Sequence, residues 1–341
     1  MDSTLNAPAP PITYTTRAPD VVELSAQEIG RLLELAGQIT ASPSENPELF
    51  CREASRMARR APDRIIELLY DFAMMGTSTG TMLFSKVPVE EPLPETPPDN
   101  THHLGETTPL ARVQAIVNHA CGQMLGYEAE GYGRLYQDMV PNRKLADSQT
   151  SLGSKVELEL HTEQAFSKLR PDVLSLACLR GHLDAKTYVL PAHLLLEHMT
   201  PAEQELLREP LWTTTVDGSF KMGGHEFLEG DLRGPMPIIA GALDDPSMLF
   251  DQDLMRGVTD EAEAIIKRVI EIYQAHRNAH TLAPGEILLV DNHRAVHGRS
   301  PFTPRFDGTD RFIIRSFAVR DFGRTRYARA GNGRVVAAEY S

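Results

Sequence analysis

Five short runs of apolar and β-branched residues after about residue 130 constrain the fold more than any other feature of the chain. They are Val156–Leu160, Leu174–Leu179, Thr187–Leu190, Ile287–Val290 and Phe312–Val319. Runs of this length and composition are typical of β-strands, whereas helices need longer periodic segments. Many short strands in one region favour packed or closed sheets, so this part of the chain is predicted to form a jelly roll or a sandwich.

Helical periodicity dominates the first third of the chain instead. The segment 25–40 begins with Ser25 three positions before Glu28, the pattern of a capping box, and continues with apolar residues at helical spacing. Similar spacing predicts helices at about 45–75 and 108–126.

Two other segments complete the expected organisation. Five prolines between Pro88 and Pro98 predict an extended loop, and a helix at about 259–282 is predicted to cover the outside of the strand core. We expect a flexible leader at residues 1–20 and a single domain at 21–341, whose helical N-terminal part spans about 21–128.

Charge and composition limit the partners of this protein. The 341 residues include 34 basic and 47 acidic ones, and the net charge of −13 repels nucleic acid and anionic lipid but attracts a small cation. No apolar stretch reaches the roughly 18 residues of a membrane span, and the N-terminus does not resemble a signal peptide. The three cysteines lack disulfide or metal-site spacing. We expect a cytoplasmic protein without nucleic-acid or membrane partners; homo-oligomerisation stays open.

A histidine and glutamate motif lies at the end of the first strand run. His161 and Glu163 are two residues apart, so their side chains project from one face of an extended backbone. His297 follows the run Ile287–Val290 after a polar turn, from where it can reach a barrel mouth. Two imidazoles and a carboxylate with open coordination positions suit non-haem Fe(II) chemistry. Ordinary surface or core placement is the alternative in a chain with 12 histidines.

Two arginines at the last strand run indicate an anion site nearby. Arg311 and Arg315 are an even number of residues apart, so a regular strand directs both to the same interior. A buried guanidinium needs an anion, and its planar fork matches a carboxylate. The pair therefore indicates two carboxylate-bearing small molecules or one dicarboxylate. Pairing with internal acids such as Asp307 and Asp310 is the alternative.

Together these motifs resemble the clavaminate synthase-like branch of the Fe(II)/2-oxoglutarate-dependent oxygenases, which includes bacterial hydroxylases of free amino acids. The matching segments, spread over roughly residues 130–325, are Leu160–Phe166, Leu176–Arg180, Val290–Arg299 and Phe302–Phe312. The resemblance implies a mainly β fold with helical additions: a double-stranded β-helix core (jelly roll, cupin-like) at about 130–325, buttressed by the N-terminal helices.

The resemblance also implies roles for individual residues. The iron-binding positions are those of His161, Glu163 and His297. Arg311 and Thr187 would hold the distal carboxylate of the cosubstrate 2-oxoglutarate, and Arg315 the α-carboxylate of the amino acid. Reaction with O2 would hydroxylate an unactivated C–H bond and convert 2-oxoglutarate to succinate and CO2. The glutamate ligand speaks against a halogenase, in which a small residue replaces it, while desaturation stays open.

Acidic residues narrow the substrate. Asp251 and Asp253 share one face if their segment is extended, and an intervening cation relieves their repulsion. A corresponding pair holds the guanidinium in arginine-hydroxylating members of the resembled family. Glu130 falls where that family places a polar residue against the α-amino group, and Ser151 is a second candidate there. The structural alternatives are a solvated acidic loop for Asp251 and Asp253, a surface charge for Glu130 and a loop cap for Ser151.

These residues describe a free basic L-amino acid, and the resemblance implies its hydroxylation at C3 or C4. We predict L-lysine, because three segments look most like lysine-hydroxylating members: Gln137–Pro141, Ser148–Ser154 and Phe250–Gly257. L-Arginine or another free amino acid is the alternative within the family. A noncatalytic cupin-like small-molecule binding protein and a zinc hydrolase are alternatives from other classes. The loop Phe166–Pro171 is a candidate lid.

Overall fold

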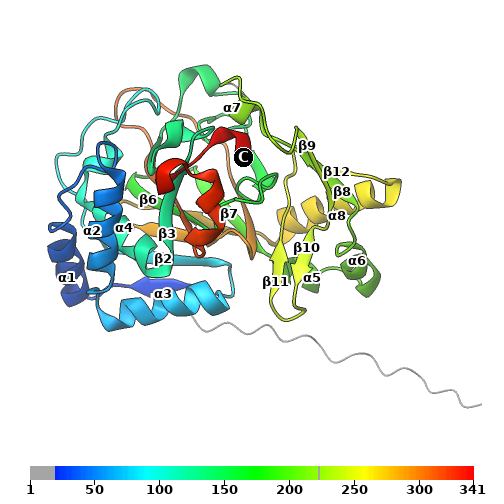
Figure 1. The fold of residues 1–341 in the computed structure, drawn as a ribbon, viewed down its shortest axis with the longest axis horizontal. Helices are drawn as coiled ribbons and strands as arrows, with labels where there is room; N and C mark the ends of the chain where they lie inside the picture. The colour runs from blue at the N-terminus through cyan, green and yellow to red at the C-terminus, as the bar shows by residue number, and fades with distance from the viewer. Residues whose placement is uncertain (1–19, 222) are drawn as a thin grey trace, which may run out of the picture.

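Two β-sheets lie face to face in the computed structural model, which describes residues 20–221 and 223–341 (Figure 1). The major sheet has eight strands in the order β1-β2-β14-β6-β16-β3-β17, with β4 also paired to β16. The minor sheet has four strands in the order β13-β7-β15-β5. This arrangement confirms the predicted double-stranded β-helix with helical additions. The predicted leader lies outside the described residues except for its last position.

The strands of the major sheet are β1 (Val21–Glu23), β2 (Thr81–Ser85), β3 (Gln123–Tyr127), β4 (Tyr136–Met139), β6 (Val173–Arg180), β14 (Ile287–Asp291), β16 (Phe312–Val319) and β17 (Val335–Val336). Those of the minor sheet are β5 (Leu158–His161), β7 (Lys186–Pro191), β13 (Asn278–Thr281) and β15 (Ala295–Arg299). Smaller sheets contain β8 (Trp212–Thr215), β9 (Leu232–Met236), β10 (Ile239–Gly241), β11 (Pro246–Met248) and β12 (Arg256–Gly257).

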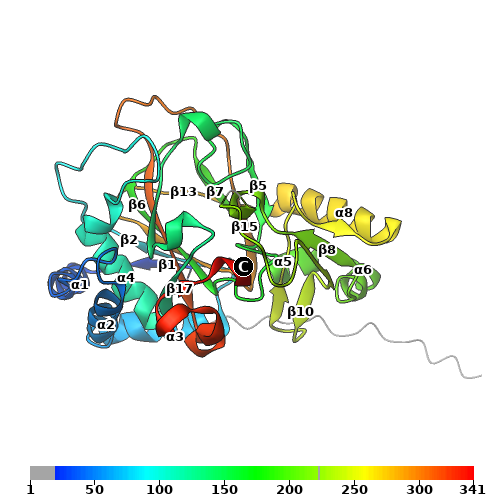
Figure 2. The same cartoon turned by 45° about the horizontal axis from the view of Figure 1, so that its top comes forward.

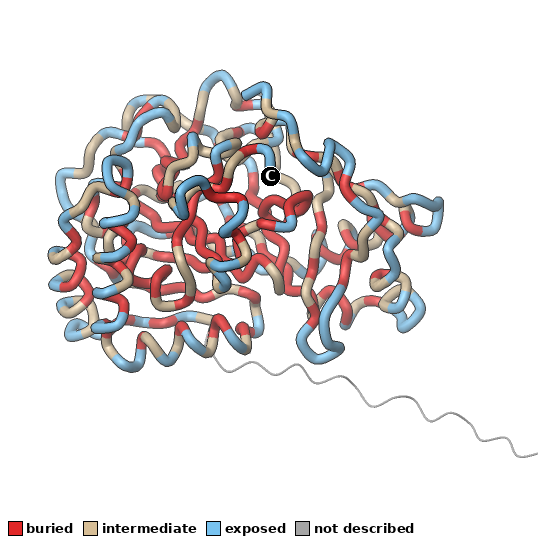
Figure 3. Tube along the Cα trace, viewed as in Figure 1, coloured by how far each residue is buried: buried red, intermediate tan, exposed pale blue. Residues whose placement is uncertain are grey.

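The side chains of the major sheet alternate between two hydrophobic cores, as period-2 strands require. On β14, Ile287 and Leu289 pack against the N-terminal helices, while Leu288 and Val290 pack into the core between the two sheets. Figure 3 shows this central region as the most continuously buried part of the chain. On β16, Ile313 faces the same inner core, so the parity of Arg311 and Arg315 directs both toward the space between the sheets.

Helices cover the outer faces of both sheets (Figure 2). Their bounds are α1 (Ala26–Ala36), α2 (Pro47–Ala58), α3 (Asp63–Met75), α4 (Pro109–Cys121), α5 (Ala192–Glu197), α6 (Pro201–Leu206), α7 (Gly218–Lys221) and α8 (Asp260–His276). The first four lie beside the major sheet, and α5 and α8 pack on the minor sheet. None of the helices in the described ranges is long and apolar enough to cross a membrane.

Three predicted helices differ from the observed ones at their ends. The predicted helix at 45–75 is two helices, because Pro62 stands at the N-cap of α3 and the chain turns before it. The predicted helix at 108–126 ends at Cys121, and the chain continues from Gly122 into β3. The predicted helix at 259–282 ends at His276, and its last residues form β13. The predicted capping box of Ser25 and Glu28 is present.

Candidate active site

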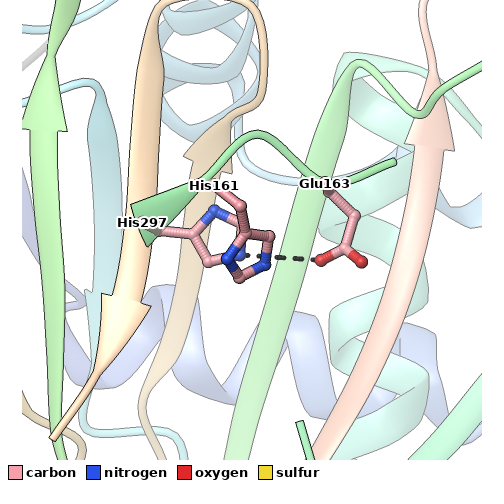
Figure 4. Close-up of side chains that lie close together, drawn as sticks. All are labelled: His161, Glu163 and His297. Atoms are coloured by element: carbon pink, nitrogen blue, oxygen red, sulfur yellow. Dashed lines mark ion pairs between the residues drawn. The ribbon is translucent and has the colours of Figure 1, made fainter. Parts of the chain in front are cut away.

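The two histidines of the motif stand side by side on the minor sheet. His161 ends β5 and His297 lies in the middle of β15, and the two are register partners. Opposed residues on neighbouring strands project from the same face, and here the ring centroids are 4.3 Å apart. Glu163 follows β5 and completes the cluster: one potential ligand atom from each of the three lies within 4.8 Å of the others (Figure 4).

The protonation states of the three side chains suit a metal. His161 Nδ1 lies 2.8 Å from the carbonyl oxygen of Glu159, an acceptor only, so Nδ1 carries the proton and Nε2 keeps a free lone pair. Burial lowers the pKa of His297 to about 4 with the help of the neighbouring His161, which leaves a neutral ring at pH 7. Burial alone raises the pKa of the Glu163 carboxyl, but Arg315 and His297 hold it at about 2.

The backbone of Glu163 is held by a buried amide. Asn292, which follows β14 and is fully buried, accepts the N–H of Glu163 at 2.7 Å. Its Nδ2 donates to the carbonyl oxygens of Glu163 and Pro171 at 3.0 and 2.8 Å. Both ends of the loop between these residues are therefore fixed, and all but one of the side chains from Glu163 to Leu169 are buried. An anchored and buried loop argues against the lid predicted at Phe166–Pro171.

Arg311 is a buried cation without an acidic partner in the described part of the chain. Its guanidinium lies 5.9 Å from the ring centroid of Phe302, and burial lowers its pKa to about 10. The internal acids that were considered as partners are engaged elsewhere: Asp310 accepts two backbone N–H groups, and Asp307 pairs with Arg305. An uncompensated buried guanidinium is suited to bind the carboxylate of a ligand.

Thr187 and Ser151 are both neighbours of Arg299. Thr187 is a buried residue of β7 and the register partner of Arg299 on β15. Ser151 belongs to a loop, and its carbonyl oxygen accepts a hydrogen bond from Arg299 at 3.2 Å. The structure thus brings Thr187 near the arginines and places Ser151 at the wall of the adjoining cavity.

Arg315 is paired with internal acids, although not with those considered from the sequence. Its guanidinium contacts the carboxylates of Glu130 and Glu163, the latter at 3.3 Å, and the amide oxygen of Gln137. Glu130 also accepts a hydrogen bond from Gln164 at 2.9 Å. Burial raises the pKa of Glu130 even though Arg315 opposes the shift. This network places one cation between two carboxylates at the edge of the metal cluster.

A cavity of about 550 Å³ opens beside the cluster. Of the described residues that line it, eight are acidic and one is an arginine: Asp99, Glu128, Glu130, Glu159, Glu163, Asp217, Asp251, Asp253 and Arg315. His161 and Ser151 also line the cavity, whereas His297, Thr187 and Arg311 do not. The cavity is therefore an acidic pocket that reaches the metal cluster but stops short of the unpaired arginine.

The predicted strand geometry of the acidic pair is wrong. Asp251 forms a single bridge to His161, and the chain then turns from Gln252 to Leu254, so Asp251 and Asp253 are not on one strand face. The Asp251 carboxylate accepts the N–H groups of Asp253 and Leu254 at 3.0 and 2.9 Å, which closes the turn. Both carboxylates nevertheless line the cavity. Burial raises the pKa of Asp251 to about 6, and Asp217 and Asp253 add to the rise.

Several site residues were not assigned from the sequence. Gln137, Gln164 and Asn292 carried no signal, because amides occur throughout a protein. Asp217 lies in a segment without periodicity, so its place in the cavity wall could not be foreseen. Arg299 could have been found, since it is two residues after His297 and shares its strand face.

Two imidazoles and a carboxylate, set beside an unpaired arginine between the sheets of a jelly roll, define a class: the Fe(II)- and 2-oxoglutarate-dependent oxygenases. Residues 240–316 match the family model "Taurine catabolism dioxygenase TauD, TfdA family". The chain is 51% identical to an L-lysine 3-hydroxylase of Catenulispora acidiphila, over 94% of this chain and 90% of that protein. It is 29% identical to clavaminate synthase 2 of Streptomyces clavuligerus, over 85% and 89%.

Solved structures show the same relationship. An asparagine oxygenase in complex with Fe(II), 3-hydroxyasparagine and succinate superposes with a TM-score of 0.85 and 28% identity, covering 94% of this chain and 99% of that one. The chain belongs to the clavaminate synthase-like family of Fe(II)/2-oxoglutarate-dependent oxygenases. It is an amino-acid hydroxylase that uses Fe(II), with 2-oxoglutarate and O2 as cosubstrates.

Proposed function

We propose that this protein hydroxylates free L-lysine at C3. The observation that carries the proposal is the acidic cavity beside the metal cluster, where eight carboxylates accompany one arginine. Such a wall favours an amino acid with a cationic side chain over a neutral or acidic one. The 51% identity to an L-lysine 3-hydroxylase over nearly the whole chain supports both the substrate and the position.

We assign the iron and 2-oxoglutarate to residues that suit them chemically. The proposed iron ligands are His161, Glu163 and His297, whose imidazole nitrogens and ionised carboxylate fit Fe(II). Arg311 and Thr187 are proposed to hold the distal carboxylate, because Arg311 is a buried guanidinium without an acid among the described residues. When bound, Fe(II) and 2-oxoglutarate supply with O2 the oxidising power for hydroxylation, and 2-oxoglutarate leaves as succinate and CO2.

An ion pair is proposed to recognise the backbone groups of the substrate. Arg315 and Glu130 contact each other, and both line the cavity. A zwitterionic amino acid can insert its α-carboxylate toward Arg315 and its α-ammonium toward Glu130, which replaces one buried ion pair by two. Ser151, on the same cavity wall, is proposed to assist at the α-ammonium.

The acidic turn is proposed to receive the other end of the substrate. Asp253 has no hydrogen bond from its carboxylate to the described residues, so it is free for the ε-ammonium, while Asp251 already closes the turn. With both ends held, the chain of methylene groups lies across the metal cluster, and the choice of carbon becomes a matter of position.

We further propose that the protein acts in the cytoplasm on a small free molecule, without nucleic-acid or membrane partners. Its net charge of −13 supports this, and so do its three cysteines, which are all buried and free. A homo-oligomer is compatible with the same site, because all the proposed residues come from one chain.

A substrate screen tests the proposal. Protein with Fe(II), ascorbate and 2-oxoglutarate should convert L-lysine to a product heavier by one oxygen atom, with succinate formed in equal amount. NMR of the product should place the hydroxyl group on C3. L-Arginine, L-ornithine and L-asparagine serve as comparison substrates. The absence of lysine-dependent succinate above background would overturn the substrate assignment, and preferred turnover of L-arginine would replace it.

A further inference from the structure

Arg299 lies between the two proposed binding sites. It ends β15, two residues after His297, so both side chains point from the same face of the minor sheet. Its register partner on β7 is Thr187, and opposed residues of paired strands stand side by side. Only 5% of Arg299 is exposed. The side chain therefore enters the space between the sheets next to a residue assigned to 2-oxoglutarate.

The hydrogen bonds of Arg299 leave its charge uncompensated. Its Nε and Nη1 donate to the carbonyl oxygens of Ser300 and Ser151, each at 3.2 Å. Its Nη2 is buried and has no acceptor within residues 20–221 and 223–341. Both acceptors are neutral, and no carboxylate of the described chain forms an ion pair with this guanidinium. One polar arm is therefore available for a ligand.

Arg299 and Arg311 approach the same aromatic ring. Their guanidinium carbons lie 5.1 and 5.9 Å from the ring centroid of Phe302. Two buried like charges with no acid between them are unfavourable unless an anion joins them. The fully buried carboxylate of Asp291, which pairs with Arg294 and Arg320, shows that this protein does supply internal acids where a cation is to be neutralised. No such acid pairs with Arg299 or Arg311 among the described residues, so their charges are available to an anion from outside the protein.

We propose that Arg299 is a second guanidinium for the distal carboxylate of 2-oxoglutarate. The inference rests on the proposed function, since it extends the site assigned to Arg311 and Thr187. A carboxylate has two oxygens and about four acceptor positions, enough for the forks of two arginines and one hydroxyl group. The free Nη2 of Arg299 supplies one of these donors, and its Nη1 keeps the contact with the Ser151 loop.

A rival role for Arg299 is purely structural, as an anchor of the Ser151 loop through the carbonyl oxygen of Ser151. A pair of 2-oxo acids separates the two roles. Both 2-oxoglutarate and 2-oxovalerate can chelate a metal through the keto acid end, but only 2-oxoglutarate has a distal carboxylate. Their dissociation constants are measured by anaerobic titration of the visible band of the Fe(II) complex, which requires no turnover.

Arg299→Gln is expected to raise the Kd of 2-oxoglutarate by about tenfold or more, because a charge-assisted hydrogen bond is lost, and to leave the Kd of 2-oxovalerate within about twofold. Arg299→Lys keeps a positive charge but loses the planar fork of donors, so its Kd for 2-oxoglutarate should lie between those of the unaltered protein and Arg299→Gln. Arg329→Gln is the matched control: Arg329 is also buried, stacks on Phe322 and donates to backbone carbonyls, but it follows Phe322–Ala328 and does not belong to the minor sheet.

The outcomes separate the inference from the function on which it rests. No 2-oxoglutarate band in the unaltered protein would overturn the proposed function itself. A normal band with unchanged 2-oxoglutarate affinity in Arg299→Gln would overturn the role of Arg299 alone. Equal weakening of both 2-oxo acids would do the same, since it would assign Arg299 to the loop.

Discussion

At the scale of single residues, the site is organised by which charges have partners inside the protein. Glu163 and Arg315 neutralise each other, and the pKa of Glu163 stays at about 2 despite burial. Arg311 has no such partner among the described residues. Among the charges assigned to ligands, Glu130, Glu163 and Arg315 are paired with one another in the protein, whereas Arg311 is left open. This contrast makes individual roles testable.

Replacing the carboxylate ligand should abolish activity. Glu163→Ala removes one of three proposed metal ligands and the partner of Arg315, so lysine-dependent succinate formation should fall to background. The anaerobic Fe(II) band with 2-oxoglutarate should also disappear. Glu157→Ala is the control, because Glu157 pairs with Arg277 near the surface and lies outside the cluster. Full activity of the Glu163 variant would remove it from the metal site.

The two aspartates of the acidic turn should behave differently when replaced. Asp253→Asn should raise the KM for L-lysine about tenfold, because a charged contact with the substrate is lost. The Tm should change little, because the Asp253 carboxylate makes no hydrogen bond to the described residues. Asp251→Ala should also lower the Tm, since Asp251 Oδ1 accepts the two N–H groups that close the turn and alanine offers them no acceptor. Steady-state kinetics and thermal melts measure both. Asp244→Asn, at an exposed position nearby, is the control.

Unchanged KM values in both variants would return the acidic turn to a structural role. The pair also shows what a sequence can and cannot reveal at this scale. The shared interior direction of Arg311 and Arg315 follows from strand parity alone and is observed. Strand parity could not predict the turn at Asp251. The Asp251 carboxylate accepts the N–H of Leu254, and this local hydrogen bond ends the extended backbone that the parity argument assumed.

At the scale of secondary-structure elements, one buried carboxylate joins three strand ends. Asp172 precedes β6, accepts hydrogen bonds from the N–H of Arg320 after β16 and from His293 between β14 and β15, and forms an ion pair with Arg324. Burial alone raises the pKa of Asp172, but His293 and Arg324 hold it at about 2, below the ordinary value of an aspartate.

Asp172→Asn should therefore cost stability in a pH-dependent way. A carboxyl group with a folded pKa below its unfolded value stabilises the fold above about pH 4, and this stabilisation is lost as the pH falls toward 2. The shift corresponds to a loss on the order of 2 kcal/mol at pH 7. Urea unfolding at pH 7 and at pH 3 measures it. Asp307→Asn, at a fully exposed carboxylate, should change stability little at either pH. A difference that stays constant with pH would contradict the linkage.

Elements were predictable where local signals decide them. The capping box of Ser25 and the strand runs of the core were foreseen, since caps and apolar patterns are local. The break before α3 and the end of α4 were missed, because apolar spacing continues across Pro62 and Gly122 although the helices do not. The pairing of β5 with β15, which brings His161 to His297, depends on contacts more than 130 residues apart and came only from the resemblance.

At the scale of the whole molecule, two hydrophobic cores, one on the outer face of each sheet, enclose a charged interior. Helices α1 to α4 pack on the outer face of the major sheet, and α5 and α8 pack on the minor sheet. Between the sheets, the apolar core gives way to the metal cluster and to the unpaired arginines. Uncompensated buried charges destabilise a fold, so the outer cores carry the stability and the interior is completed by ligands.

Ligand binding should therefore stabilise the whole domain. At a concentration of 100 times its Kd, 2-oxoglutarate with Mn(II) as a redox-inert metal should add about 2.7 kcal/mol. For a domain of this size that is a rise in Tm of roughly 4 °C. Differential scanning fluorimetry measures the shift, and 2-oxovalerate, which has no distal carboxylate, should produce a smaller one.

Arg311→Met tests whether the interior is built for a ligand rather than for stability. The variant replaces an unpaired buried cation by an apolar side chain, so its Tm without ligands should equal or exceed that of the unaltered protein. Its 2-oxoglutarate-dependent rise in Tm should fall to that produced by 2-oxovalerate. Arg329→Met should do the opposite, because Arg329 satisfies backbone carbonyls: a lower Tm and an intact rise. A strongly destabilised Arg311→Met protein would mean that its guanidinium supports the fold, and the stability of the domain would then depend on the interior as well as on its two outer cores.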